Sequence, residues 1–358
     1  MRVGILTFHR AYNYGAVLQA YALQKKLNDM GVNSEIIDYL SLDMQSQMRL
    51  FSYDRSLSIK GNFIKFVKDF YRKKKNMAFD LFIGEEMQLS QKRYSDFNGL
   101  VKLDRQNLYD VYIVGSDQVW NNKNNLEDRA FLLGFTEDDT KKCSYAASLG
   151  NAHLDGKVCE QYQKELKKFR VLTVREEDSI EKYKFLSENG AKAVIDPTLL
   201  LKKEKYETIA SPRIVKRKYA FLYTIAQDRK LRKYARKFCK ENGLILVDSK
   251  RSRVFFKNSS PRDFLSFIKH SEYVFTNSFH GTAFSIIMQK QFATELNTKH
   301  SFNNRSNDLM MKTGLLYRDI ESDSFDMKEI IDYKKVNGAV KELRDEAVQI
   351  LREIVREQ

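Results

Sequence analysis

The sequence predicts an α/β fold made of two doubly wound, Rossmann-like domains that face a cleft. Three observations predict it: short apolar runs alternate with helix-forming stretches, the alternation starts again after about residue 204, and 358 residues exceed one ordinary core. We expect an N-terminal domain over 1–203, a C-terminal domain over 204–335 and a closing helix over 336–358, which could pack back on the N-terminal domain.

The first strand and helix set the pattern of the N-terminal half. Residues 2–7 predict a buried strand, because V-G-I-L is short, apolar and bounded by turn residues. After Gly15, apolar residues recur roughly at helical spacing, and Gly31 is placed to end that helix. A second strand over 34–39 completes a strand–helix–strand unit, which predicts a parallel sheet.

Further strands and helices continue this alternation. In the N-terminal half we expect a basic helix over 58–80 and strands over 111–114, 142–147, 171–174 and 193–195. In the C-terminal half we expect strands over 219–224, 244–247 and 273–276, and helices over 229–241, 260–270 and 282–289. The second half therefore repeats the architecture of the first.

Net charge and composition indicate which kinds of partner and compartment to expect for the protein. The formal net charge of +15 favours anionic partners, but no zinc finger, ribonucleoprotein motif or convincing helix-turn-helix occurs, so we expect no nucleic-acid partner. The three cysteines form no C-x-x-C pair, which suits a reducing cytoplasm and predicts neither a disulfide framework nor a zinc site. The sequence offers no signal peptide and no apolar run of the roughly 18 residues that a membrane span needs.

Phosphate-binding and metal-binding signatures are also missing. The chain contains no Walker-type G-x-x-x-x-G-K-[ST] loop and no G-x-G-x-x-G after a strand. It contains no H-E-x-x-H and no clustered aspartates. We therefore expect neither a resident cofactor nor a metal.

Four polar loops follow predicted strands, at the edge where parallel α/β sheets bind ligands. The first runs from His9 to Gly15 and precedes a helix, so its backbone N–H groups and the helix dipole could hold an anion. Gly15 would let a ligand approach the backbone closely. The alternative is an ordinary strand-to-helix turn whose residues only cap the helix.

The second loop contains Ser116, Asp117, Gln118 and Trp120. Its polar residues could contact a sugar, and Trp120, the only tryptophan, could stack on one. The alternative is that Ser116 or Asp117 caps a helix while Trp120 fills the core.

The third and fourth loops supply charge and a possible proton carrier. Arg175 follows a strand, where its planar guanidinium could bind a carboxylate or phosphate, or could instead pair with Glu176 or Asp178. His280 follows another strand at a helix start, a position suited to acid–base work, although a lone histidine is more often a simple hydrogen-bonding residue. Arg305 lies in a polar loop and could add a further positive group or merely be solvated.

The chain resembles the polysaccharide pyruvyl transferase family in six segments, which follow the family's order over about residues 1–315. The most distinctive is T-F-H-R-A-Y-N-Y-G-A-V-L-Q-A-Y-A-L near the start. The others are D-V-Y-I-V-G-S-D-Q-V-W-N, S-Y-A-A-S-L-G, V-R-E-E-D-S, V-I-D-P-T-L-L and T-N-S-F-H-G-T-A-F-S-I-I-M-Q-K. The resemblance implies a GT-B-like, two-domain enzyme that transfers the enolpyruvyl group of phosphoenolpyruvate to two hydroxyls of a sugar. The product would be a pyruvate ketal on a capsular or exopolysaccharide precursor, with a galactose-type residue as the expected acceptor.

The resemblance also implies roles for the loop residues. The arginine of the family's V-R-(D/E)-x-x-S motif falls on Arg175, and the histidine of its R-x-H motif falls on His280. The arginine of R-x-H is Ser278 here, a departure for which Arg305, His9 or Arg10 could compensate. The expected catalytic residues are His280, Arg175 and Asp117. The expected donor-binding residues are Arg175, Asn13, Tyr14, Gly15, Ser278, Gly281, Thr282 and Arg305. The expected acceptor-binding residues are Ser116, Asp117, Gln118, Trp120 and His9. We expect these loops to gather positive charge and a histidine around a small, doubly anionic donor.

Two alternatives to this function stay open. A nucleotide-sugar glycosyltransferase could use a similar two-domain fold, and Ser278 would suit a non-catalytic protein of a capsule pathway. The basic, aromatic helix over 58–80 could lie on the inner face of the plasma membrane beside a lipid-linked oligosaccharide acceptor, or could be an ordinary surface helix. The sequence leaves the oligomeric state undetermined.

Overall fold

The computed structural model describes residues 1–51, 56–125, 128–225, 228–296 and 304–356. Its N-terminal domain is built on a parallel sheet in the order β2-β1-β3-β4. The strands are β1 (Arg2–Leu6), β2 (Asn33–Ile36), β3 (Val111–Val114) and β4 (Lys142–Ser144). A shorter parallel pair, β5 (Thr173–Val174) and β6 (Lys192–Ala193), continues from β4 through isolated bridges.

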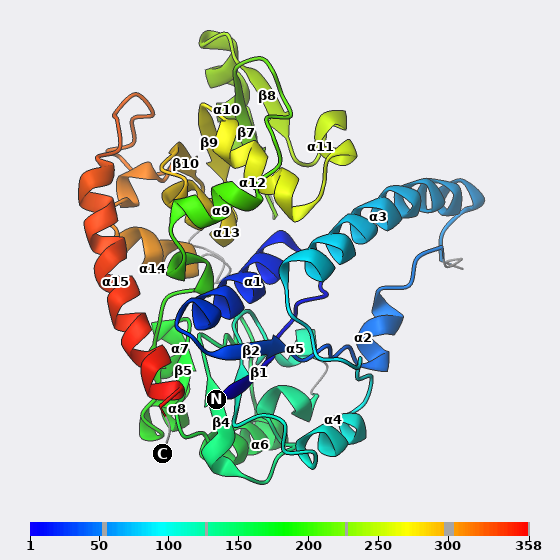
Figure 1. The fold of residues 1–358 in the computed structure, drawn as a ribbon. Coiled ribbons are helices and arrows are strands. Elements are labelled where there is room, and N and C mark those ends of the chain that lie inside the picture. The colour runs from blue at the N-terminus through cyan, green and yellow to red at the C-terminus, as the bar shows by residue number, and fades with distance from the viewer. Residues whose placement is uncertain (52–55, 126–127, 226–227, 297–303, 357–358) are drawn as a thin grey trace.

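The C-terminal domain contains a second parallel sheet in the order β10-β9-β7-β8. Its strands are β7 (Tyr219–Tyr223), β8 (Ile245–Asp248), β9 (Tyr273–Thr276) and β10 (Gln291–Thr294). In Figure 1 the two sheets occupy the lower and upper parts of the molecule, with α1 (Tyr14–Asp29) between them. The predicted pair of doubly wound α/β domains is confirmed.

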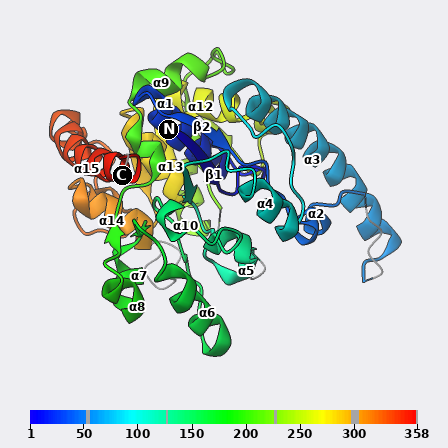
Figure 2. The same cartoon turned by 60° about the horizontal axis from the view of Figure 1, so that its bottom comes forward.

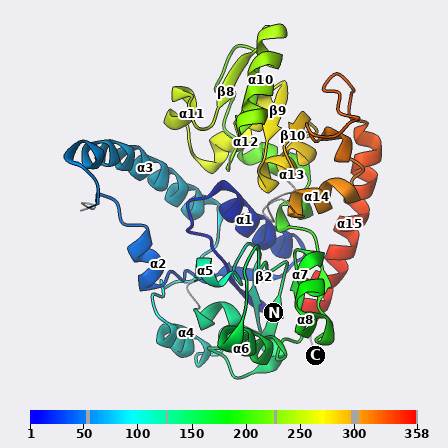
Figure 3. The same cartoon turned by 180° about the vertical axis from the view of Figure 1, so that it is seen from behind.

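Helices cover both sheets. The N-terminal half contributes α2 (Leu42–Gln47), α3 (Ile59–Glu86), α4 (Phe97–Asp104), α5 (Asn122–Asn125), α6 (Gly156–Leu166), α7 (Glu177–Lys182) and α8 (Lys184–Glu188). The C-terminal half contributes α9 (Lys203–Ile209), α10 (Arg229–Glu241), α11 (Arg253–Lys257), α12 (Pro261–His270), α13 (Phe279–Ile287), α14 (Asn304–Lys312) and α15 (Tyr333–Ile354). Figure 2 and Figure 3 show the same arrangement from below and from behind.

Capping residues fix the starts of the helices that matter for the cleft. The side chain of Asn13 accepts hydrogen bonds from the backbone N–H groups of Gly15 and Ala16 at the start of α1. Ser278 caps α13 by accepting from Gly281 N–H. Because this cap precedes Phe279, α13 begins three residues before the predicted start at residue 282.

One aromatic cluster joins the two domains. The ring of Tyr14 stacks on Phe264 of α12 at a centroid distance of 4.6 Å, and it also meets Tyr223 and Phe255 edge-on. The hydroxyl of Tyr14 donates to the Ser259 carbonyl at 3.1 Å. The domains therefore share a continuous apolar core beneath the first strand-end loop.

The last helix spans both domains. At its start the Tyr333 hydroxyl donates to the Lys290 carbonyl of the C-terminal domain. Along its length Arg344 donates to the Leu199 carbonyl at 2.8 Å, and near its end Arg170 donates to the Ile354 carbonyl at 2.7 Å. Helix α15 thus packs along the N-terminal domain after leaving the C-terminal one (Figure 1).

Helix α3 is longer than predicted and projects from the body. Its last turns bury Phe79, Phe82 and Ile83, while its first half extends away from both domains, as Figures 1, 2 and 3 agree. In the described part of the chain, no helix combines the length and apolarity needed to span a bilayer.

Candidate functional site

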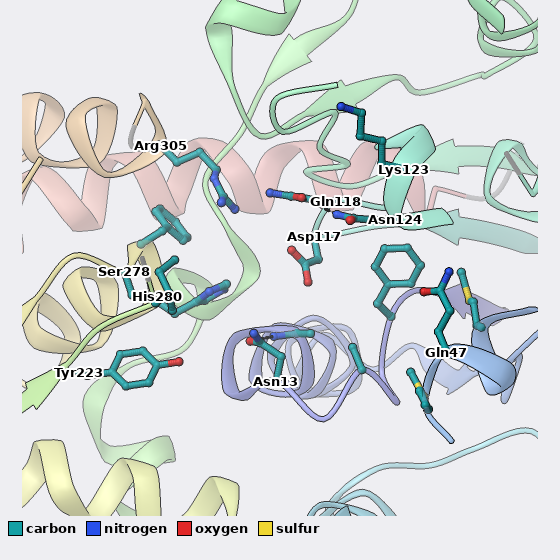
Figure 4. A pocket seen from close by; sticks show the side chains of 17 residues that line it. Asn13, Gln47, Asp117, Gln118, Lys123, Asn124, Tyr223, Ser278, His280 and Arg305 are labelled. Atoms are coloured by element: carbon teal, nitrogen blue, oxygen red, sulfur yellow. Dashed lines mark hydrogen bonds between the residues drawn. The ribbon is translucent and has the colours of Figure 1, made fainter. Parts of the chain in front are cut away.

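A cleft of about 470 Å³ lies between the domains, where loops at the carboxyl ends of β1, β3, β7 and β9 meet. Both domains contribute side chains to it, and Figure 4 shows those from β7, β9 and α14 facing those from the first domain. This is the edge at which parallel α/β sheets bind ligands. The lining residues are Phe8, Ala11, Asn13, Ala16, Met44, Gln47, Met48, Asp117, Gln118, Lys123, Asn124, Tyr223, Ile225, Ser278, Phe279, His280 and Arg305.

The N-termini of α1 and α13 meet at the floor of this cleft. The His280 ring lies so close to Gly15 that a Cβ at residue 15 would be 2.0 Å from Nδ1 of His280. Only glycine permits this contact. The positive ends of two helix dipoles therefore converge on one point, which is a suitable place for an anion.

His280 is buried and lacks a hydrogen-bond partner for its Nε2 atom among the described residues. The nearest carboxylate oxygen, Oδ2 of Asp196, is 3.8 Å away. Burial lowers the pKa of His280 to about 4, although Asp196 and Asp117 partly oppose this change. The imidazole is consequently neutral near pH 7, and its Nε2 atom is buried without a hydrogen bond among the described residues.

Arg175 lies behind the cleft in a network of ion pairs. Its guanidinium contacts Asp196 at 2.9 Å, Glu176 at 3.2 Å and Asp117 at 3.7 Å, and its side chain is 2% exposed. Burial opposes the charge on Arg175, but these three carboxylates more than offset that effect and raise its pKa. The alternative expected from the sequence, a pair with Glu176, is therefore present, and Arg175 is not among the residues that line the cleft.

Arg305 is the cation that reaches the cleft from the C-terminal domain. It stands over one side of the Phe279 ring, and Arg175 stands over the same ring, each at 5.4 Å from the centroid. Its closest carboxylate is Glu176 at 3.7 Å. Burial and the nearby charge of Arg175 lower the pKa of Arg305 to about 10, so it remains positively charged at neutral pH.

The side chains around the cleft do not carry the excess of positive charge that we expected. Arg175, Arg305 and Lys123 are matched in number by three carboxylates, those of Asp117, Glu176 and Asp196. Positive potential in the cleft must then come mainly from the helix N-termini and from Arg305 and Lys123, which line the cleft, rather than from Arg175, which lies behind it.

The loop after β3 forms the opposite wall. The Asp117 carboxylate points into the cleft and faces the His280 side (Figure 4). Gln118 accepts hydrogen bonds from the side-chain amides of Asn121 and Asn124, which hold its amide in place. Lys123 and Asn124 complete a polar wall that can hydrogen-bond hydroxyl groups.

Besides Arg175, four expected site residues lie away from the cleft. Trp120 is fully buried and its indole N–H donates to the Phe131 carbonyl at 2.8 Å, which corrects the expectation that it stacks on a sugar. The His9 ring is fully buried against Asp38, so it cannot meet an acceptor. Ser116 is buried with its hydroxyl bonded to the Ala146 carbonyl, and Tyr14 belongs to the interdomain aromatic cluster.

Two further expected residues support the floor of the cleft rather than lining it. Gly281 lies against Thr276, where a Cβ would approach the threonine hydroxyl to 2.1 Å. Thr282 is fully buried in the first turn of α13. Arg10, which we considered as a substitute for the missing arginine, is held by Asp38 through two hydrogen bonds, from Nε and Nη2.

Sequence reasoning missed Asp196, Tyr223 and Lys123. Asp196 accepts two hydrogen bonds from Thr198 and one from Arg175, so it links the strand-end loops beneath His280. In the sequence it directly follows the predicted strand over 193–195 and precedes Pro197, a position at a sheet edge that could have indicated it. Tyr223 ends β7, a position that a strand-end search of the second domain would have found. Within the described residues, no cluster of three or more His, Cys, Asp or Glu side chains could hold a metal ion.

Comparison with known structures identifies the fold. The UDP-GlcNAc 2-epimerase of Methanocaldococcus jannaschii matches with a TM-score of 0.51 at 12% identity, covering 99% of this chain and 100% of the epimerase. A putative UDP-N-acetylglucosamine 2-epimerase of Listeria monocytogenes gives the same TM-score and identity, over 97% and 90% of the two chains. At such low identity this likeness concerns the GT-B-like fold alone.

Sequence comparison gives a family. The model of the family described as polysaccharide pyruvyl transferase matches residues 13–294. No curated protein matches the chain. The matched range includes the loops after β3, β5, β7 and β9 and the last residue of the loop after β1, Asn13, and thus most of the cleft lining.

Proposed function

Because the chain belongs to the polysaccharide pyruvyl transferase family, we propose that it transfers the enolpyruvyl group of phosphoenolpyruvate to two hydroxyls of one sugar residue. The products are a pyruvate ketal and inorganic phosphate. The observation that best supports this proposal is the meeting of two helix N-termini at the His280 ring, within a cleft lined by both domains.

The donor carries a phosphate and a carboxylate, so its site must offer positive potential and N–H donors. The α1 and α13 N-termini offer positive potential beside Asn13 and Ser278, whose side chains already accept hydrogen bonds from the N–H groups of Gly15 and Gly281. Arg305 can make a charge-assisted hydrogen bond to the same donor. In this proposal Arg305 supplies the charge that Ser278, in place of the family arginine, does not.

Arg175 acts as a positioning residue in this proposal. Its guanidinium joins Asp196, Glu176 and Asp117, and thereby holds the loops after β3 and β5 at a fixed distance from α13. The Arg175 side chain is buried behind the cleft lining, so we assign the contact with the donor to Arg305 instead. We therefore replace the sequence-based role of Arg175 in donor binding with one in organising the carboxylates.

The reaction needs one proton at the methylene carbon of the donor. Protonation there leaves the central carbon electron-deficient, and a sugar hydroxyl attacks it. The C–O bond to phosphate breaks, and the second hydroxyl closes the ketal at the same carbon. Of the two hydroxyl protons, one balances the new C–H bond and the other leaves with phosphate, so no oxidant or reductant is required.

His280 and Asp117 face each other across the space where these atoms would lie. A bound dianion would raise the pKa of His280 from its low value, so that the imidazole could hold a proton during the reaction. Asp117 can accept a hydrogen bond from a sugar hydroxyl and orient it. Gln118, Lys123 and Asn124 extend this acceptor wall toward the cleft entrance. The cleft thus holds both reactants close together, which favours reaction through proximity.

The acceptor that we propose is a galactose-type residue of a capsular or exopolysaccharide precursor, carried on a soluble or lipid-linked oligosaccharide. The test is release of phosphate from phosphoenolpyruvate in the presence of a panel of β-galactosides and lipid-linked sugars, with mass detection of the ketal. A parallel reaction with sugar nucleotides separates the alternatives. Use of a sugar nucleotide without phosphoenolpyruvate would establish a glycosyltransferase, and inactivity with every donor would favour a non-catalytic protein.

A further inference from the structure

Helix α3 exposes a stripe of large apolar side chains along its projecting half. Ile59, Phe63, Phe66 and Phe70 recur at helical spacing, and they are 85%, 68%, 56% and 63% exposed. Val67 and Tyr71 widen the stripe on one side and are also exposed. Scattered apolar residues are ordinary on protein surfaces, but a continuous stripe on a projecting helix indicates a binding surface.

Positive charge surrounds this stripe. Between Ile59 and Lys75 the helix has seven Lys and Arg residues and a single acidic residue, Asp69. Asp69 is buried, with one oxygen accepting from the Phe51 backbone N–H and the other 3.4 Å from Arg72. The exposed surface of this half-helix is therefore cationic and aromatic, without an exposed negative charge.

A groove of about 570 Å³ continues the same surface toward the C-terminal domain. Its apolar floor includes Tyr14, Phe255 and Phe256, and its cations come from α3 and α11. Four of these cations, Lys68, Lys75, Arg253 and Lys257, have no anionic partner within the described part of the chain. Lys75 instead lies over the rings of Tyr14 and Phe79, at 4.8 and 5.1 Å.

We propose that α3 and this groove form a docking surface for a bilayer that contains anionic phospholipids. The apolar stripe enters the boundary between headgroups and acyl chains, and the cations of the groove meet lipid phosphates. Charge complementarity favours this partner over a second copy of the chain, since pairing two such helices would bring like charges together. The docking surface does not depend on the reaction in the cleft.

The test measures binding of the full chain to vesicles by co-sedimentation. We compare phosphatidylcholine vesicles with vesicles in which about one third of the lipid is phosphatidylglycerol. The expected result is binding to the anionic vesicles alone, weakened by added salt. Failure to bind anionic vesicles at low salt would overturn the proposal.

Two variants and one control separate this surface from general positive charge. The triple variant Phe63→Ser, Phe66→Ser, Phe70→Ser and the double variant Lys68→Glu, Lys257→Glu should each weaken binding by roughly tenfold or more. The control is Lys233→Glu, Arg236→Glu, Lys240→Glu on α10, another exposed basic helix without an apolar stripe. It should bind within about twofold of wild type, and an equal loss in the control would show that net charge alone attracts the protein.

A spectroscopic measurement tests insertion directly. The sole tryptophan, Trp120, is fully buried, so its emission is a constant background for a Phe66→Trp variant. The new tryptophan should shift its emission to shorter wavelength on addition of anionic vesicles. No shift would contradict insertion of the stripe. A lipid-free dimer that the triple serine variant dissociates would assign the stripe to a second copy instead.

Discussion

The His280 ring rests directly on the α-carbon of Gly15, and the two residues bring the starts of α1 and α13 together from different domains. Each helix start is held by its own cap, Asn13 or Ser278. The position of the imidazole is therefore set by a backbone contact rather than by a hydrogen bond to Nε2. This contact leads to the first of four predictions about the cleft.

Gly15→Ala should lower turnover by roughly a hundredfold, because the added methyl group displaces His280 from its place between the helix ends. The measurement is phosphate release from phosphoenolpyruvate, with thermal unfolding of the same sample. Gly338→Ala in α15 is the matched control, since its methyl group meets open space and should leave turnover unchanged. Normal turnover in Gly15→Ala would show that the position of His280 does not matter for the reaction.

His280→Gln should lower turnover by at least roughly a hundredfold, the effect of losing an acid–base group. It should also alter the dependence of stability on pH. The folded-state pKa of His280 is about 4, below its ordinary 6.5, so the unfolded chain binds the proton more tightly. The wild-type free energy of unfolding should thus include a contribution of up to about 3 kcal/mol that is present above pH 6.5 and lost as the pH falls toward 4.

Denaturant unfolding of wild type and His280→Gln at a series of pH values measures this contribution. The difference between their unfolding free energies should change between pH 6.5 and 4 and be constant above pH 7. Parallel curves over the whole range would contradict the burial of a neutral imidazole at this position.

Arg175→Ala should lower the free energy of unfolding by about 3–5 kcal/mol, because it leaves Asp196 and Glu176 buried without their cation. Turnover should fall by at least roughly a hundredfold as the carboxylates move. The double variant Arg175→Met, Asp196→Asn removes both charges of one pair and should be more stable than Arg175→Ala. Equal stability of the two variants would mean that the ion pairs do not organise this region.

Arg305→Ala should raise KM for phosphoenolpyruvate by roughly ten- to a hundredfold, as expected when a charge-assisted hydrogen bond to the donor is lost. The matched control is Lys312→Ala on the same helix, whose ammonium pairs with Glu177 and Asp308 away from the cleft. It should leave KM unchanged. An unaltered KM in Arg305→Ala, measured with saturating acceptor, would exclude Arg305 from the donor site.

The sequence predicts the alternation of strands and helices well, because hydrophobic periodicity and helix caps are local signals. It also indicates which loops meet, since the carboxyl ends of parallel strands share one edge. Asn13, Asp117 and His280 are identified in this way, and the structure brings all three to one cleft. Arg305, which the sequence places in a polar loop, lies instead in helix α14 and reaches the same cleft. Their catalytic and binding roles remain predictions.

Whether a loop residue faces the core or the cleft depends on tertiary packing. The sequence therefore predicts it less well than it predicts strands and helices. Trp120 and Asp117 lie three residues apart in one polar segment, yet Trp120 faces the core and Asp117 faces the cleft. Arg175 pairs with Asp196 across 21 positions of the chain, so no local sequence pattern indicates this ion pair. Met44 and Met48 of the α2 region reach the cleft only through tertiary packing.

Tyr14 sits between Asn13, which caps helix α1 at the cleft, and Gly15, against which the His280 ring packs. Its ring stacks on Phe264 of α12 in the C-terminal domain. The contact between the two halves and the geometry of the cleft floor thus depend on three consecutive residues, Asn13, Tyr14 and Gly15. A substitution of Phe264, which does not line the cleft, should therefore disturb the floor of the cleft as well as weaken the contact between the two halves.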